Sequence, residues 1–260
     1  MFLLAAGHDP DKIDILHHLL DSPTFFGMNL SQYGITKHVW LMWLASALLI
    51  LLMTTAARRG GVVPRGLQGF FEPVLLFIKE ELAVPNFHEK ADKYCPYLWT
   101  TFFFILFCNL LGLFPGSATA TGNLSITAGL ALISFFGIHM VGIKENGLVG
   151  YAKSIVPEVP WWLWPLLLVV ELVGILTKPF ALAVRLWANM NGGHIIILVL
   201  LGFIFMVKNS GILVQTPVVA ISIGAATAIY FLEIFVALVQ AYVFTFLTAV
   251  FIGMAAHPDH

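Results

Sequence analysis

The two longest apolar stretches of this chain are each longer than a membrane is thick. Residues 161–207 form an almost unbroken apolar stretch of 47 residues, and residues 218–256 form another of 39. At about 1.5 Å per residue, a helix over the second stretch would be roughly 58 Å long, about twice the ~30 Å hydrocarbon core of a bilayer. This stretch has no proline and only two glycines, Gly224 and Gly253, which disfavours an internal turn. The sequence therefore predicts a pair of long, strongly tilted membrane helices near 161–207 and 218–256.

The overall composition is that of a membrane protein. Of the 260 residues, 59% are hydrophobic and only 10% are charged, whereas about a quarter of a soluble domain is charged. The net charge of -1 argues against a nucleic-acid partner, because phosphate binding needs a basic surface. The two cysteines, Cys95 and Cys108, suit neither a disulfide framework nor a metal site, so no metal or cofactor is expected.

Three shorter spans precede the long pair. Apolar segments of membrane-spanning length predict transmembrane helices near 38–57, 97–114 and 124–143. Residues 66–84 instead mix apolar and charged side chains in a pattern typical of an amphipathic helix at the membrane interface. The predicted fold class is thus an all-α membrane protein.

The distribution of basic residues predicts the orientation of these helices. The segment between the first and second spans contains Arg58, Arg59, Arg65, Lys79, Lys90 and Lys93. Lys144 and Lys153 follow the third span, whereas the turn after the second span has no lysine or arginine. Because cytoplasmic loops are enriched in basic residues, we expect the N-terminus outside and the C-terminus in the cytoplasm.

Arg185 is the most informative residue of the long apolar pair. An arginine cannot lose its charge by deprotonation, so at membrane depth it needs a counter-charge or water. No acidic residue occurs from Leu172 to Leu232, so an acidic partner must come from a distant part of the chain or from another chain. A snorkelling arginine at a helix end is the alternative, but the apolar sequence continues on both sides.

Helical spacing places small residues around this arginine. Ala181, Ala188, Asn189 and Gly192 share the helix face of Arg185, and small residues let another helix approach closely. His194 is nine positions away and is expected on the opposite face. The pattern favours a smooth surface past which the carboxylate of a partner could move.

The last apolar stretch carries a single acid, Glu233. Gln240 lies seven positions later on nearly the same face, which Tyr230 and Ala237 flank. A lone carboxylate in such a stretch is costly unless it is wet, paired or protonated. His194 and Glu233 would together form a titratable couple. Gln240 as a packing contact and His194 as an isolated histidine remain the structural alternatives.

Three motifs resemble subunit a of the rotary F-type ATP synthases. They are the segment KPFALAVRLWANM at 178–190 followed by Gly192-Gly193, the segment NLLGLFP at 109–115, and Glu233 followed by QAYVF at 240–244. The resemblance extends from about Pro64 to the C-terminus, and its most specific part is the block around Arg185.

The resemblance implies a non-catalytic subunit that moves protons for ATP synthesis. Its partners would be the c-subunit ring, the peripheral-stalk b subunits, the other subunits of the F-type ATP synthase and the lipid bilayer of a bacterial inner membrane. Two offset aqueous half-channels would lead to the ring carboxylates. Arg185 would keep a passing carboxylate ionised and separate the half-channels, Gln240 would lie near that arginine, and Asn189 would line the site.

One departure from the bacterial pattern is informative. Many bacterial members have an acid at the position of His194 and a histidine at that of Glu233, and the exchange found here resembles the mitochondrial arrangement. We therefore expect these two residues to act as a pair in the entry half-channel.

Further polar positions are weaker candidates for lining the half-channels. They are Asn109, His139, Glu171, Lys178 and Tyr230. The expected organisation is an extramembrane arm at 1–36, one membrane domain at 37–256 with an ion-translocating hairpin at 161–256, and a tail at 257–260. A secondary transporter or channel with its own substrate site is the alternative function, although no convincing internal repeat is found. A passive membrane anchor is disfavoured by the cost of placing Arg185 and Glu233 in the membrane.

Overall fold

The computed structural model describes residues 24–25, 28–29, 37–58, 66–114, 120–155, 163–208 and 210–256. Two strands of two residues each, β1 (Thr24–Phe25) and β2 (Met28–Asn29), pair antiparallel. Apart from this pair, the predicted arm 1–36 lies outside the described residues, as does the tail 257–260.

The rest of the described chain is helical, as the composition predicts. The helices are α2 (Lys37–Arg58), α3 (Leu67–Ile78), the π-helix η2 (Lys79–Ala83), α4 (Val84–Phe87), the 3-10 helix η3 (His88–Lys90), α5 (Ala91–Gly112), the 3-10 helix η4 (Ala120–Gly122), α6 (Leu124–Ile155), α7 (Trp164–Met206) and α8 (Ile212–Ala256). Within the described ranges, five helical segments are long and apolar enough to cross a membrane. The all-α membrane fold is therefore confirmed.

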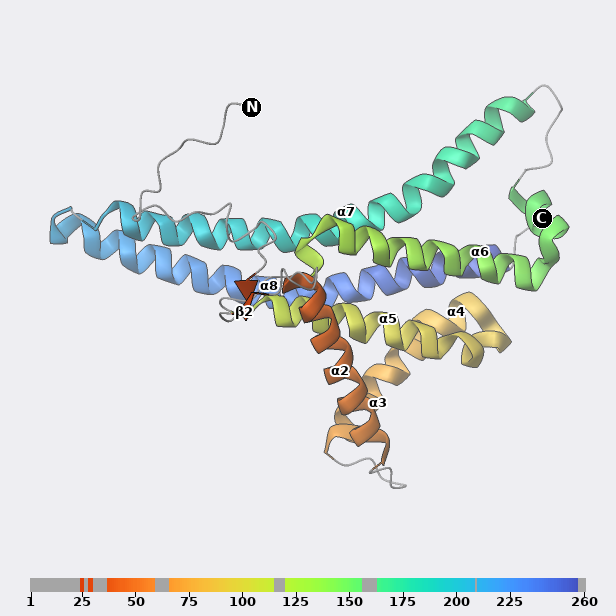
Figure 1. Cartoon of the computed structure of the whole chain (residues 1–260), viewed down its shortest axis with the longest axis horizontal. Coiled ribbons are helices and arrows are strands. Elements are labelled where there is room, and N and C mark those ends of the chain that lie inside the picture. Colours follow the sequence, from red (N-terminus) through yellow and green to blue (C-terminus); the bar gives the residue numbers. More distant parts are fainter. Residues whose placement is uncertain are drawn as a thin grey trace.

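The last two helices form a long hairpin. α7 has 43 residues and α8 has 45. They run side by side over the part of the hairpin near their connection, and the N-terminal part of α7 then turns away from α8 (Figure 1). Pro179 lies inside α7, where its missing N–H removes one helical hydrogen bond. The predicted pair of long helices is present, and α7 is bent.

Three helix boundaries differ from the sequence prediction. α8 begins at Ile212, six residues before the predicted start, because Pro217 is accommodated in the second turn instead of ending a loop. α5 begins at Ala91 and likewise contains Pro96 within its first two turns. α6 continues past residue 143 to Ile155, across a break at Gly147, where φ is 73° and ψ is 164°. Such a backbone conformation favours glycine.

α5 lies at the centre of the fold. It contacts α2, α3, α4, η4 and α8 (Figure 1). Its buried side chains form a continuous row, which consists of Ala91, Tyr94, Cys95, Leu98, Phe102, Phe103, Ile105, Cys108 and Asn109. The C-terminal half of α8 packs against this core, and its close approach to the α4 segment depends on Gly253, where a Cβ would lie 2.9 Å from the carbonyl oxygen of Asn86. The core thus fixes the C-terminal half of α8, whereas the end of the hairpin where α7 connects to α8 is exposed.

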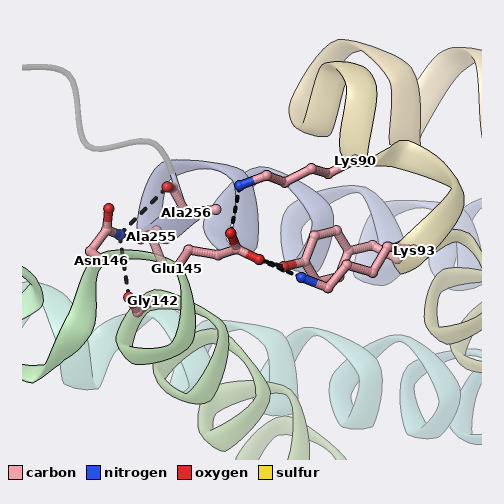
Figure 2. A network of polar contacts seen from close by, with 8 residues as sticks. Lys90, Lys93, Gly142, Glu145, Asn146, Ala255 and Ala256 are labelled. Atoms are coloured by element: carbon pink, nitrogen blue, oxygen red, sulfur yellow. Dashed lines mark hydrogen bonds and ion pairs between the residues drawn. The ribbon is translucent and has the colours of Figure 1, made fainter.

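A polar network joins α6, just before its break at Gly147, to the start of α5 and the end of α8. The carboxylate of Glu145 on α6 accepts hydrogen bonds from Lys90, Lys93 and Tyr94, at the start of α5 (Figure 2). The neighbouring Asn146 donates to the carbonyl oxygen of Ala255 on α8, at 2.8 Å. The Glu145 side chain is only 11% exposed. We call these residues the Glu145 network; it ties α6 to both α5 and α8.

Candidate functional site

The helix α7 has two contrasting faces around Arg185. Leu182, Leu186 and Met190 are buried, whereas Arg185 and Asn189 are exposed. Ala181 and Ala188, which share the face of Arg185, are exposed as well. This alternation follows from the helical period, because apolar side chains spaced by four residues face the core together. The face of small residues predicted from the sequence is thus an exposed surface of the chain.

Arg185 has no partner within the described part of the chain. None of the ion pairs or hydrogen bonds formed among the described residues includes its guanidinium. A permanently charged group on an apolar helix needs a counter-charge or water. The described residues supply no such counter-charge, so this surface is suited to a partner that brings one.

His194 and Glu233 come together across the α7–α8 hairpin. Nδ1 of His194 lies 3.1 Å from Oε1 of Glu233. The Glu233 side chain is 4% exposed and that of His194 is 27% exposed. Oε2 of Glu233 is buried and has no hydrogen-bond partner among the described residues. The pair therefore combines a buried carboxylate, one of whose oxygens is unbonded, with an imidazole that reaches toward the surroundings.

Gly193 makes room for this carboxylate. A Cβ added at Gly193 would overlap the side chain of Glu233, whereas one added at the neighbouring Gly192 would meet nothing within 4 Å. The absence of a side chain at one position of α7 thus lets a carboxylate from α8 lie directly against the helix backbone.

A second polar pair lies two helical turns further along α8. Nδ2 of Asn189 donates to Oε1 of Gln240 at 2.8 Å. Gln240 and Ala237 are buried on the same face of α8 as Glu233. The hairpin is therefore joined by two polar contacts, one on each side of the small residue Ala237. Asn189 is exposed, so this pair reaches the face on which Arg185 lies.

The end of α5 and the helix η4 hold the hairpin from the other side. Asn109 is fully buried, donates to the carbonyl oxygen of Ala237 at 3.3 Å, and accepts a hydrogen bond from Thr121 at 2.8 Å. The hydroxyl of Tyr230 donates to the carbonyl oxygen of Leu113 at 3.2 Å. Asn109 and Tyr230 are thus brought close to the His194–Glu233 pair as parts of its frame.

The remaining candidates lie elsewhere. The ring of His139 packs at a tilt against that of Phe135, with 4.1 Å between the ring centroids, and its Nδ1 lies 2.8 Å from the carbonyl oxygen of that residue. Lys178 lies over the ring of Phe251, 5.2 Å from the ring centroid. Glu171 lies on α7, but its side chain is outside those that the structure describes. None of these three is brought to the His194–Glu233 pair by a described contact.

Several residues of the frame were not singled out from the sequence. Asn191 of α7 donates to the carbonyl oxygen of Gly122 at 2.9 Å, and Thr121 holds Asn109. In the sequence, Gly193 appears only as part of the pair Gly192-Gly193, and nothing there indicates that it makes space for Glu233. Asn191 is a polar residue in an apolar stretch, which is a usable signal, whereas nothing in the local sequence around Thr121 points to a partner twelve residues away.

Comparison with known proteins places these motifs in a family. The family model described as ATP synthase A chain matches residues 39–253, which is most of the chain. The chain belongs to the ATP synthase A chain family. Membership agrees with the resemblance of the Arg185 block and with the five apolar helical segments. A member of this family is an integral, multi-pass membrane subunit without a catalytic site of its own.

Several curated relatives are named ATP synthase subunit a. One from Anaeromyxobacter sp. is 47% identical over 230 residues, covering 86% of this chain and 55% of the relative. Another from Chloroherpeton thalassium is 41% identical over 271 residues, covering 97% of this chain and 80% of the relative. A third from Myxococcus xanthus is 46% identical over 236 residues, covering 87% and 76% respectively. The chain thus spans about half the length of the Anaeromyxobacter relative and most of the length of each of the other two relatives.

Proposed function

We propose that this chain carries protons between the aqueous phase and carboxylates on a rotating ring of c subunits, as the stator subunit of an F-type ATP synthase. The observation that supports this most strongly is the exposed Arg185 on a face of small residues, without a counter-charge in the described chain. Arg185 separates two half-channels and keeps a passing carboxylate ionised. Proton movement through the chain is thereby coupled to rotation and to ATP synthesis.

The electrostatics of this arrangement are consistent. A ring carboxylate approaching Arg185 supplies the missing counter-charge, and the small side chains beside it allow the close approach of another helix. The ion pair must break each time the carboxylate is protonated. The membrane potential contributes only about 2.3 kcal/mol per charge per 100 mV, so the net strength of the pair has to stay near that scale. Water in the half-channels weakens the attraction enough for this exchange.

The His194–Glu233 pair forms the proton entry point in this proposal. Imidazole and carboxylate in contact can pass a proton between them, and the partly exposed histidine ring connects the buried acid to water. Oε2 of Glu233, which has no hydrogen-bond partner among the described residues, is an acceptor for a water molecule of the half-channel. Asn189 and Gln240 line the path from this pair to Arg185.

The weaker candidates divide between the two half-channels. Asn109 and Tyr230 frame the hairpin beside the entry pair and line the outer half-channel, together with His139. Lys178 and Glu171, seven residues apart on one face of α7, line the inner half-channel.

The complex and its orientation follow from the same proposal. The partners are the c-subunit ring, the peripheral-stalk b subunits and the other subunits of the synthase, in a bacterial inner membrane. The excess of lysine and arginine between α2 and α5 supports an N-terminus outside and a C-terminus in the cytoplasm. Reporter fusions to either terminus, active on only one side of the membrane, would test the orientation.

The proposal is tested by ATP-driven proton pumping in membrane vesicles that contain the assembled complex. Arg185→Ala and Arg185→Lys are both expected to abolish coupled pumping, because an alanine has no charge and a lysine lacks the fixed planar donors of a guanidinium. Lys208→Ala changes a basic residue at the exposed end of α7 and is the matched control, with pumping expected to be unchanged. Immunoblotting of the purified complex checks that each variant assembles.

Two results would overturn the proposal. Normal coupled pumping by both Arg185 variants would show that the arginine is not needed to couple proton movement to rotation. Ion flux through the isolated chain, with saturable substrate dependence, would instead support a secondary transporter or channel.

A further inference from the structure

A cavity on the far side of the core takes no part in the site described above. It has a volume of about 630 Å³ and lies between α2, α3 and α5. Its apolar wall includes Met53 of α2, Phe71 and Leu75 of α3, and Phe103 of α5. Cavities of this size hold small ligands in proteins. It is a candidate binding site that is independent of the α7–α8 hairpin.

The cavity opens to the surroundings of the protein. Ile50, Ala57, Pro96 and Thr100 belong to its lining and are exposed on the surface. In a multi-pass membrane protein, these surroundings are lipid over the apolar spans. α2 crosses the membrane and α3 is the amphipathic helix expected at the interface, so the cavity connects the hydrocarbon core with the headgroup region.

One end of the cavity is polar and accepts hydrogen bonds. Gln68 and Glu72 are one helical turn apart on α3, and both line the cavity. Nε2 of Gln68 lies 3.5 Å from Oε2 of Glu72, which leaves Oε1 of Gln68 buried without a partner among the described residues. Glu72 is in none of the ion pairs formed within the described ranges.

The other polar groups beside this end are already used. Nε1 of Trp99 donates to the carbonyl oxygen of Leu75 at 3.0 Å, and the hydroxyl of Thr100 donates to that of Pro96 at 2.7 Å. The polar end therefore presents a carboxylate and an amide oxygen, both acceptors. The complementary ligand group is a cation with several N–H donors, because a buried acceptor without a donor is costly.

We propose that this cavity binds a membrane phospholipid with a primary-amine headgroup. Its ammonium group donates hydrogen bonds to Glu72 and Gln68, and one acyl chain lies along Phe71, Leu75 and Phe103. A choline headgroup carries the same charge but has no N–H, so the site discriminates between the two headgroups.

The test uses the full-length chain in lipid nanodiscs and phosphatidylethanolamine with a photoreactive group in one acyl chain. Labelled positions are identified by mass spectrometry of peptides. We expect labelling at Met53, Leu75 and Phe103. Unlabelled phosphatidylethanolamine should compete at a concentration about tenfold lower than phosphatidylcholine with the same acyl chains, since a charge-assisted hydrogen bond contributes about that factor.

Two variants and one control make the result decisive. Glu72→Gln and Gln68→Leu should each reduce the preference for the ethanolamine lipid. In Glu72→Gln, the two unlabelled lipids should compete at equal concentrations. Glu80→Gln changes an exposed acid of the same segment that does not line the cavity, and it should keep the tenfold preference. Circular dichroism confirms that each variant is folded.

Other outcomes overturn the proposal. Equal competition by both lipids in the unchanged chain shows that the polar end of the cavity does not discriminate between the ethanolamine and choline headgroups. An unlabelled cavity shows that no lipid enters it. A photoreactive amino acid at position 53 that crosslinks to a polypeptide in native membranes assigns the cavity to a partner protein instead. None of these readouts involves proton movement, so they are separate from the function proposed above.

Discussion

The carboxylates of Glu145 and Glu233 lie in opposite kinds of surroundings within the same chain. Glu145 accepts hydrogen bonds from two lysines and a tyrosine, among them one of 2.7 Å from Tyr94 (Figure 2). Glu233 is more deeply buried, contacts one histidine nitrogen, and has an oxygen with no partner among the described residues. The first carboxylate is saturated with donors, whereas the second is not.

We interpret this difference as one between a structural acid, Glu145, and an acid suited to the proton exchange proposed above, Glu233. Several donors hold the charged form of a carboxylate, and at Glu145 both oxygens already accept hydrogen bonds, so a proton on either oxygen would displace or weaken a contact. The surroundings of Glu233 are consistent with either protonation state, because its single partner can donate or accept. We therefore expect substitutions at the two glutamates to affect different properties: proton transfer at Glu233 and assembly of the core at Glu145.

The largest effect is expected from exchanging the members of the His194–Glu233 pair. His194→Glu places two acids together and Glu233→His places two imidazoles together, so each single variant should lose most ATP-driven proton pumping. The double variant restores one acid and one imidazole in contact and should recover a substantial part of it. Silent single exchanges would falsify the idea that the two residues act as a pair. Pumping in vesicles, normalised to the amount of assembled complex, is the measurement.

A smaller effect is expected from filling the space beside Glu233. In Gly193→Ala, the new Cβ would overlap the carboxylate, so Glu233 must shift away from His194. Coupled pumping should fall several-fold while the complex still assembles. Gly202→Ala is the matched control on the same helix, because a Cβ there meets nothing within 4 Å. Equal activity of the two variants would mean that the close fit at Gly193 is unimportant.

The smallest effect on transport is expected from substitution of Glu145. Glu145→Gln removes the charge that the two lysines share, and it should lower the midpoint of thermal unfolding by a few degrees. Because Lys90 and Lys93 are about half exposed, solvent reduces the contribution of these ion pairs. Pumping per assembled complex should stay near that of the unchanged chain. A loss of pumping without any change in stability would show that the contrast between the glutamates is mistaken.

The sequence was sufficient for the features that depend on local spacing. The length of apolar segments predicts the membrane helices, and the helical period predicts the exposed face of Arg185 and the shared face of Glu233 and Gln240. The structure also brings His194 and Glu233 together, as the exchange of acid and imidazole suggested. The roles of these residues in proton transfer remain predictions that the experiments above address.

Features that depend on long-range packing could not be read from the sequence. Glu145 joins residues more than fifty positions earlier, and no local pattern specifies that contact. The importance of Gly193 depends on the rotation of α8 against α7, which sequence periodicity leaves open. The predicted start of α8 near residue 218 excluded Pro217, although a proline near the start of a long helix costs only one hydrogen bond.

The length of α7 has a geometric consequence for the two ends of the proposed proton path. Measured along its axis, a helix of 43 residues is about 65 Å long, so the average inclination of the bent α7 must be roughly 60° from the membrane normal to stay within a ~30 Å core. Arg185 and His194 are nine residues apart, or about 13.5 Å along that axis. Resolved into components, this is about 12 Å sideways and about 7 Å in depth, and the sideways part exceeds the 8–10 Å spacing of packed helices. The two positions thus differ more in their place along the membrane plane than in depth. Because a separation of nine residues places the two side chains half a turn apart about the helix axis, they also face different surroundings.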